Sequence, residues 1–116
     1  MPYPVYRFCT GDVDGDGHED ALVGVVKSTR YHRETGRRIF IFKQVKGKVR
    51  PLWLGSRLGA TLVDFRFTDG NIRALETDGQ GHYGVADYRW NDFGPVCHRL
   101  LIKITDKDTA LKYFEL

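Results

Sequence analysis

The stretch DVDGDGHEDALVGVV, residues 12–26, joins an acidic, glycine-containing segment directly to an apolar one. The second part, residues 21–26, is rich in β-branched side chains, which is typical of a buried strand. The first part places glycines between aspartates, where the backbone must turn sharply. We therefore expect residues 12–20, which we name the acidic loop, to lead into a strand.

The acidic loop carries the donor groups of a calcium site. Ca²⁺ takes six to eight oxygen ligands from carboxylates, carbonyls and water, and without a cation several close carboxylates would repel one another. The predicted ligands are the side chains of Asp12, Asp14, Asp16 and Asp20 and the backbone carbonyl of His18. The alternative is a bare acidic turn, because Asp-Gly pairs also join strands without a metal.

We do not expect the loop to be an EF-hand. That motif needs a bidentate Glu at its twelfth position, and counting from Asp12 this position is Val23. The segment that follows also has the pattern of a strand rather than a helix.

Residues 11–24, GDVDGDGHEDALVG, resemble the calcium-loop signature of FG-GAP/VCBS-type repeats, the blade repeats of integrin-like β-propellers. In that family an Asp-x-Asp-x-Asp-Gly-x-x-Asp loop precedes a strand and binds Ca²⁺. The matching positions here are Asp12, Asp14, Asp16, Gly17 and Asp20. The resemblance implies a structural calcium ion and a role in binding a protein or glycan partner. A propeller needs about four blades or more, for which 116 residues are too few.

The remaining chain alternates short β-rich segments with turns, and little helix is expected. We predict one all-β domain over residues 1–116, an antiparallel meander of eight or nine strands that forms either a sandwich or a small barrel. The predicted strands are residues 5–9, 21–26, 38–43, 49–54, 62–67, 72–76, 83–90, 100–105 and 110–114.

An internal repeat is suggested by the segment DGDGH at residues 14–18, which recurs as DGQGH at residues 78–82. Two blade-like units, residues 5–58 and 62–116, would follow. The second copy has Gln80 in place of Asp16 and Gly84 in place of Asp20, so it lacks most of the ligands. The alternative is coincidence, because Asp-Gly-x-Gly turns are common.

Basic residues are concentrated between Lys27 and Arg57, where ten of them accompany a single acid, Glu34. Such a segment can bind anionic polymers. The alternative is a set of solvated strand edges, where lysines prevent edge-to-edge pairing. No nucleic-acid-binding motif accompanies the charge, so we do not expect nucleic acid as the partner.

We expect no catalytic activity. Residues 9–15 resemble the nucleophile motif of haloacid-dehalogenase-type phosphatases, which makes a metal-dependent phosphatase an alternative. However, Asp16 stands where that motif has threonine, and no alternation of strands and helices follows. Neither of the serines, Ser28 and Ser56, lies in a Gly-x-Ser-x-Gly elbow.

Three aromatic residues, Trp53, Tyr88 and Trp90, form a second candidate binding surface, with burial in the core as the alternative. Cys9 and Cys97 either form a disulfide or are two buried thiols, and no zinc-ligand spacing is present. No apolar run reaches the length of a membrane span. No signal peptide is visible, but a calcium loop suits a calcium-rich compartment. Our hypothesis is an exported, extracytoplasmic domain whose leader has been removed.

Overall fold

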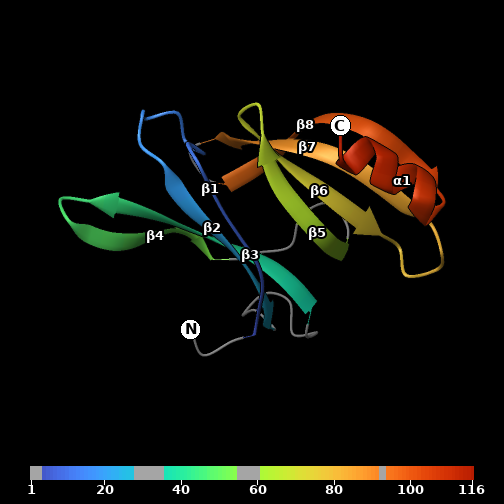
Figure 1. The fold of residues 1–116 in the computed structure, drawn as a ribbon, viewed down its shortest axis with the longest axis horizontal. Helices are drawn as coiled ribbons and strands as arrows, with labels where there is room; N and C mark the ends of the chain where they lie inside the picture. The colour runs from blue at the N-terminus through green and yellow to red at the C-terminus, as the bar shows by residue number, and fades with distance from the viewer. Residues whose placement is uncertain (1–3, 28–35, 55–60, 92–93) are drawn as a thin grey trace.

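The structure is a computed structural model that describes residues 4–27, 36–54, 61–91 and 94–116 (Figure 1). These residues form eight strands followed by one helix. The elements are β1 (Val5–Gly11), β2 (Asp20–Lys27), β3 (Gly36–Val45), β4 (Lys48–Leu54), β5 (Thr61–Thr68), β6 (Asn71–Thr77), β7 (Tyr83–Asn91), β8 (Gly94–Thr105) and α1 (Lys107–Phe114).

The strands form two four-stranded antiparallel sheets. The first sheet has the order β1-β2-β3-β4 and the second the order β5-β6-β7-β8, so neighbours in each sheet are also neighbours in the sequence. The prediction of an all-β antiparallel meander is confirmed. The sequence left open whether the strands form a sandwich or a small barrel. The described strands form a sandwich of two sheets and no closed barrel.

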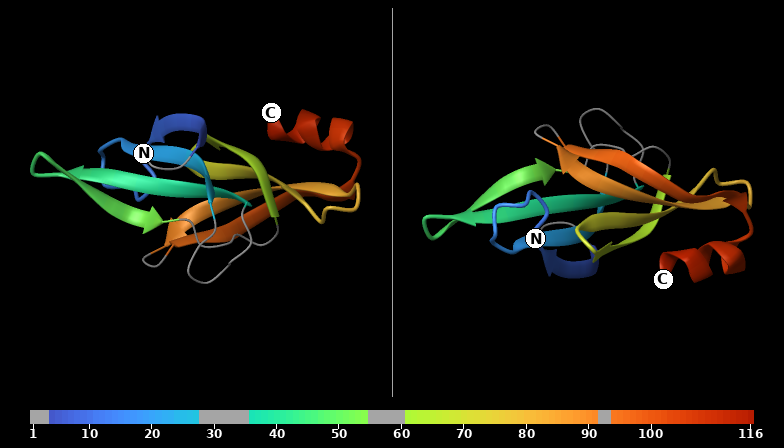
Figure 2. Two further views of the ribbon diagram at one scale, coloured as in Figure 1. Left: turned by 90° about the horizontal axis from the view of Figure 1, so that it is seen from below. Right: turned by 90° about the horizontal axis from the view of Figure 1, so that it is seen from above.

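The main hydrophobic core lies between the two sheets (Figure 2). Strand alternation turns Leu22 of β2 into this core, and the register of the first sheet pairs it with Ile41 of β3. Both side chains are fully buried, as is Phe65 of the second sheet. The buried members of this core are Val13, Leu22, Ile39, Ile41, Leu62, Phe65, Ile72, Ala74, Ala86 and Tyr88.

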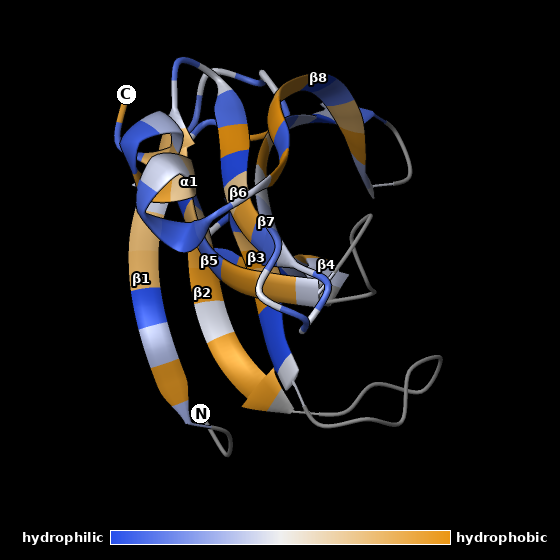
Figure 3. Cartoon of the chain, turned by 90° about the vertical axis from the view of Figure 1, so that its right-hand side faces the viewer, coloured by the Kyte–Doolittle hydropathy of each residue, from blue (hydrophilic) through white to orange (hydrophobic). Residues whose placement is uncertain are grey.

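A glycine lets the two sheets approach closely. Apolar residues predominate along β2 (Figure 3), but Gly24 interrupts them at a position that faces the core. A Cβ at Gly24 would lie 2.7 Å from the Tyr6 ring and 2.9 Å from the Phe65 ring, closer than real Cβ contacts allow. Tyr6 and Phe65 meet edge to face, with ring centroids 6.1 Å apart.

The predicted last strand, residues 110–114, is wrong, because this segment belongs to helix α1. The Asp106 side chain accepts a hydrogen bond from the Thr109 backbone and caps the helix N-terminus. Ala110 and Phe114 are four residues apart and therefore share one helix face. They are buried with Leu75 and Val85 of the second sheet. Two apolar residues at helical spacing after a capping aspartate produced the helix.

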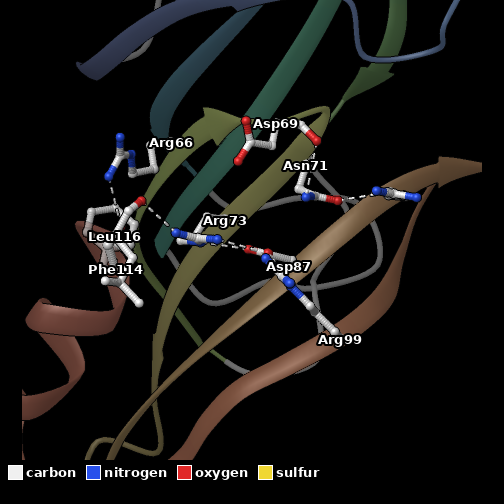
Figure 4. Close-up of polar contacts among 9 residues, drawn as sticks. Arg66, Asp69, Asn71, Arg73, Asp87, Arg99, Phe114 and Leu116 are labelled. Atoms are coloured by element: carbon white, nitrogen blue, oxygen red, sulfur yellow. Dashed lines mark hydrogen bonds and ion pairs between the residues drawn. The ribbon is translucent and has the colours of Figure 1, made fainter.

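A row of charged residues crosses the second sheet beside the end of α1 (Figure 4). Asp87 of β7 is fully buried and lies between Arg73 of β6 and Arg99 of β8. Arg73 donates two hydrogen bonds to Asp87, of 2.8 and 3.0 Å, and Arg99 donates one of 2.9 Å. Arg73 also donates to the Leu116 carbonyl, and this bond ties the end of the helical segment to the sheet.

Substitution of Asp87 tests the contribution of this row to stability. Removing one partner of a buried ion pair leaves the other charge uncompensated. We expect Asp87→Asn to lower the free energy of unfolding by about 3 kcal/mol, measured by urea denaturation at pH 7. Asp69→Asn, at an exposed turn, is the control and should change stability by less than about 0.5 kcal/mol. Equal denaturation midpoints for the two variants would contradict the prediction.

The same carboxylate gives a prediction of pH dependence. Burial raises the pKa of Asp87, but hydrogen bonds from Arg73 and Arg99 outweigh burial and hold the pKa below the ordinary value of 3.8. Its stabilising contribution is therefore complete above pH 3.8 and is lost as the pH falls through the lower value of the folded state. We expect the stability difference between the parent and Asp87→Asn to narrow below about pH 4. A constant difference across acid titration would argue against this.

Candidate metal centre

The acidic loop connects β1 to β2 at one end of the first sheet. The strands on either side are paired up to the base of the loop, where Gly11 lies opposite Asp20. Within the loop, Gly15 and Gly17 have positive φ angles of 76° and 87°. This conformation is open to glycine without steric cost, and it lets the chain reverse within a few residues.

The base of the loop is held against the sandwich. A Cβ at Gly11 would lie 2.2 Å from the Phe67 ring, so this ring of the second sheet lies directly on the Gly11 backbone. The next apolar residue, Val13, is 6% exposed and belongs to the main core. The loop is therefore anchored to both sheets, although its tip is exposed.

Asp12 organises the loop backbone. Its carboxylate accepts hydrogen bonds from the backbone N–H groups of Gly15, Asp16 and Gly17, at 2.9, 3.1 and 2.8 Å. Asp20 performs a similar role at the base, where its Oδ2 accepts from the Val13 N–H at 3.0 Å. These bonds turn both carboxylates towards the inside of the loop.

Three of the predicted ligands come together. Carboxylate oxygens of Asp12, Asp14 and Asp20 all lie within 4.8 Å of one another. Two oxygens of this group, Asp14 Oδ1 and Asp20 Oδ1, are buried and have no hydrogen-bond partner among the described residues. Asp20 as a whole is only 2% exposed. Burying anionic oxygens without a partner is costly, so the group lacks a donor or a cation.

Lys43 of β3 supplies one positive charge to the loop. Its Nζ lies 2.6 Å from Asp14 Oδ2 and 2.9 Å from Asp16 Oδ2. The register of the first sheet explains this position. Ala21 of β2 pairs with Phe42 of β3, so Lys43, the residue after Phe42, lies beside the end of the acidic loop. No local sequence pattern connects Lys43 to residues 12–20, so it was not among the predicted site residues.

The charged groups in the loop shift one another's pKa values. The hydrogen bond from Lys43, with a second from the His18 backbone, lowers the pKa of Asp16 to about 2. Burial raises the pKa of Asp20, and the negative charges of Asp14 and Asp16 raise it further. The hydrogen bonds to Asp14 and Asp16 raise the pKa of Lys43 above its ordinary value. Lys43 therefore stays charged beside the cluster.

Of the two other predicted ligands, Asp16 is not part of the three-carboxylate group. Asp16 is exposed, bonds to Lys43 through Oδ2 and accepts from the His18 N–H through Oδ1. His18 is also exposed, and the role of its backbone carbonyl stays a prediction.

The second Asp-Gly loop, residues 78–82, joins β6 to β7. Gly79 and Gly81 have positive φ angles of 80° and 87°, close to those of the glycines in the acidic loop. Asp78 accepts from the backbone N–H groups of Gln80 and His82 and pairs with the His82 ring at 2.7 Å. The same kind of turn thus forms here around a single aspartate.

The three candidate aromatic residues all contact the main core, but they differ in how far they are buried. Tyr88 is 4% exposed and donates a hydrogen bond of 2.6 Å to Glu76. Trp53 and Trp90 are half-buried and pack against the main core. Tyr88 also lines a cavity of about 370 Å³ beside β8, together with Ala86, Cys97, Leu100 and Ile102.

The described part of the segment from Lys27 to Arg57 does not form one continuous basic surface. Arg38 is buried, and Lys43 is occupied in the acidic loop. Arg37 stacks over the Tyr6 ring and donates to the Val63 carbonyl. Exposed basic residues remain at the β3–β4 hairpin, namely Lys46, Lys48 and Arg50. The other charged residues of the predicted basic segment, including Arg30, Arg33, Glu34 and Arg57, lie outside the described residues.

The cysteines are free thiols rather than a disulfide. Cys9 is half-buried, and burial raises the pKa of its thiol. Cys97 is exposed on β8, so the expectation of two buried thiols is wrong for this residue. It lies on an edge strand of the second sheet, where neighbouring side chains leave it accessible.

No protein-family model, curated protein or solved structure matches this chain. Among the residues that the structure describes, no helix combines the length and apolar character needed to span a membrane.

The hydrogen bonds of Asp12 give a prediction for the loop itself. Asp12→Ala removes the acceptor of three backbone N–H groups, so the amides of Gly15, Asp16 and Gly17 should exchange faster with solvent in the metal-free protein. Amide hydrogen exchange followed by NMR measures this directly. Glu19→Ala, which removes an exposed acid of the same loop, is the control and should leave these three amides unchanged. Equal exchange rates in both variants would show that Asp12 does not hold the turn.

Proposed function

We propose that this protein is a calcium-binding β domain that holds one Ca²⁺ in the acidic loop between β1 and β2. The observation that carries the proposal is the pair of buried carboxylate oxygens, Asp14 Oδ1 and Asp20 Oδ1, with no hydrogen-bond partner among the described residues. A divalent cation would supply both with a partner and would offset the repulsion between the carboxylates.

The spacing of the carboxylates supports calcium as the ion. Calcium–oxygen distances are about 2.3–2.6 Å, so two ligands of one ion are separated by at most about 5.2 Å. The corresponding limit for magnesium, with distances of about 2.0–2.1 Å, is about 4.2 Å. The oxygens of Asp12, Asp14 and Asp20 lie within 4.8 Å of one another, a spread that calcium accommodates without contraction of the loop.

The remaining ligands would come from the loop tip and from water. Three carboxylates provide three to six oxygens, depending on whether each binds through one oxygen or two, and calcium needs six to eight. Asp16 and the carbonyl of His18 are the further protein ligands that the sequence predicts. To bind the ion, Asp16 would give up its ion pair with Lys43.

We infer a structural role for the ion, without catalysis. The proposed ligands belong to one turn whose base is anchored by Gly11 on Phe67 and by Val13 in the core. Binding there would stabilise the β1–β2 hairpin and its contact with the second sheet. The resemblance to FG-GAP/VCBS-type repeats supports a wider proposal, that this is an exported module that binds a protein or glycan partner. Glycan-array binding in calcium that is lost in chelator would support the glycan form of this role.

Thermal unfolding with excess Ca²⁺ and with chelator tests the metal site. A ligand at about 100 times its Kd adds roughly 2.7 kcal/mol to the stability of the folded state. We expect the Tm of the parent to be higher in calcium than in chelator. The Tm of Asp20→Asn should be the same in both. In chelator, Asp20→Asn should melt at a higher temperature than the parent, because the amide can still accept from Val13 while one of the clustered charges is removed.

Glu19→Gln is the matched control, because it removes one negative charge from an exposed position of the same loop. It should keep the calcium-dependent increase in Tm. The proposal fails if the parent melts at the same temperature in calcium and in chelator.

A further inference from the structure

The acidic loop already contains a cation in the form of the Lys43 ammonium group. Its Nζ bridges Asp14 and Asp16 at 2.6 and 2.9 Å. The contact is shielded, since the Lys43 and Asp14 side chains are 22% and 14% exposed. An ion pair with this degree of burial is screened less by salt than one on an open surface.

Asp14 belongs to two groups at once. Its Oδ2 is bonded to Lys43, whereas its Oδ1 is buried without a partner among the described residues, and the residue is part of the three-carboxylate group. An ion bound by Asp12, Asp14 and Asp20 would therefore share the Asp14 carboxylate with the lysine. Two positive charges on one carboxylate repel each other strongly, so both cannot bind there at full strength.

The position of Lys43 allows one cation to replace the other. Its backbone is fixed in β3, where Lys43 pairs with Arg50 of β4. Its ammonium group is carried on a flexible four-carbon stem, and it can leave Asp14 by rotation of the side chain alone. Replacement of the lysine by a metal ion thus requires no change in the sheet.

We propose that Lys43 is the internal counter-ion of the metal-free acidic loop and that Ca²⁺ binds by displacing its ammonium group from Asp14. This inference rests on the proposed calcium site. It has two consequences. The loop keeps its fold without metal because Lys43 offsets part of the repulsion between aspartates, and the calcium affinity is lower than the carboxylates alone would give, because the ion must compete with the lysine.

The experiment compares Lys43→Met with Lys48→Met by calorimetric titration with Ca²⁺. Lys48 is exposed on the same hairpin, so its substitution removes the same charge without touching the loop. We expect Lys43→Met to lower the Kd for calcium by about tenfold or more. Lys48→Met should change the Kd by less than about threefold, because Lys48 is exposed and solvent and salt screen its charge. In chelator, Lys43→Met should melt several degrees below the parent, and Lys48→Met close to it.

The possible outcomes separate this inference from the proposed function. Equal calcium affinities for Lys43→Met and Lys48→Met would overturn the displacement model and leave the calcium site standing. Absence of calcium binding in the parent and in both variants would overturn the site and the displacement together. Binding by Lys43→Met at concentrations where the parent binds nothing would support displacement in its strongest form.

A measurement on the parent avoids dependence on the folding of a variant. The NMR signals of the Lys43 side-chain Nζ and of its neighbouring methylene report the ion pair directly. We expect them to shift upon addition of Ca²⁺ towards the values of an exposed lysine such as Lys48. Calcium binding that leaves the Lys43 signals unchanged would overturn the inference.

Discussion

The contact of Phe65 with the backbone of Gly24 joins the two halves of this protein. Phe65 is fully buried, and its ring lies so close to Gly24 that no side chain could occupy that position of β2. Tyr6 closes the same contact from β1 with its edge-to-face ring. Phe65 is a buried member of the main core and Tyr6 packs against that core, so this contact is part of the packing that holds the two sheets together.

Much of the fold follows from local patterns in the sequence. Alternation of apolar and polar residues, with glycine turns between, predicts the strands and their antiparallel order. The C-terminal helix was not predicted from the sequence. Its two buried residues, Ala110 and Phe114, are only about one helical turn apart, and so short a segment does not show a helical period. The sequence also could not distinguish a sandwich from a barrel. This difference depends on how the faces of the sheets pack together, which the patterns of the individual strands do not determine.

The sequence was sufficient to predict that three aspartates of the acidic loop converge, but not that a lysine from another strand pairs with them. Asp12, Asp14 and Asp20 are close in sequence, and their convergence follows from the turn that the glycines permit. Lys43 joins them only through the pairing of β2 with β3, which no local motif encodes. The loop of residues 78–82 makes the distinction clear. Glycine gives both loops similar turns, while the number of aspartates determines whether a cluster of charge forms.

The order of strands in the two sheets has a consequence for how the chain folds. Each strand pairing among the described residues links consecutive segments, so every hairpin can form by closing a short loop, which costs little entropy and is fast. The contact of Gly24 with Phe65 instead joins residues that are distant in the chain. Docking of two preformed sheets is therefore the step expected to limit the folding rate. Until it occurs, each sheet exposes an apolar face through which chains can associate, and this is the stage at which aggregation would compete with folding.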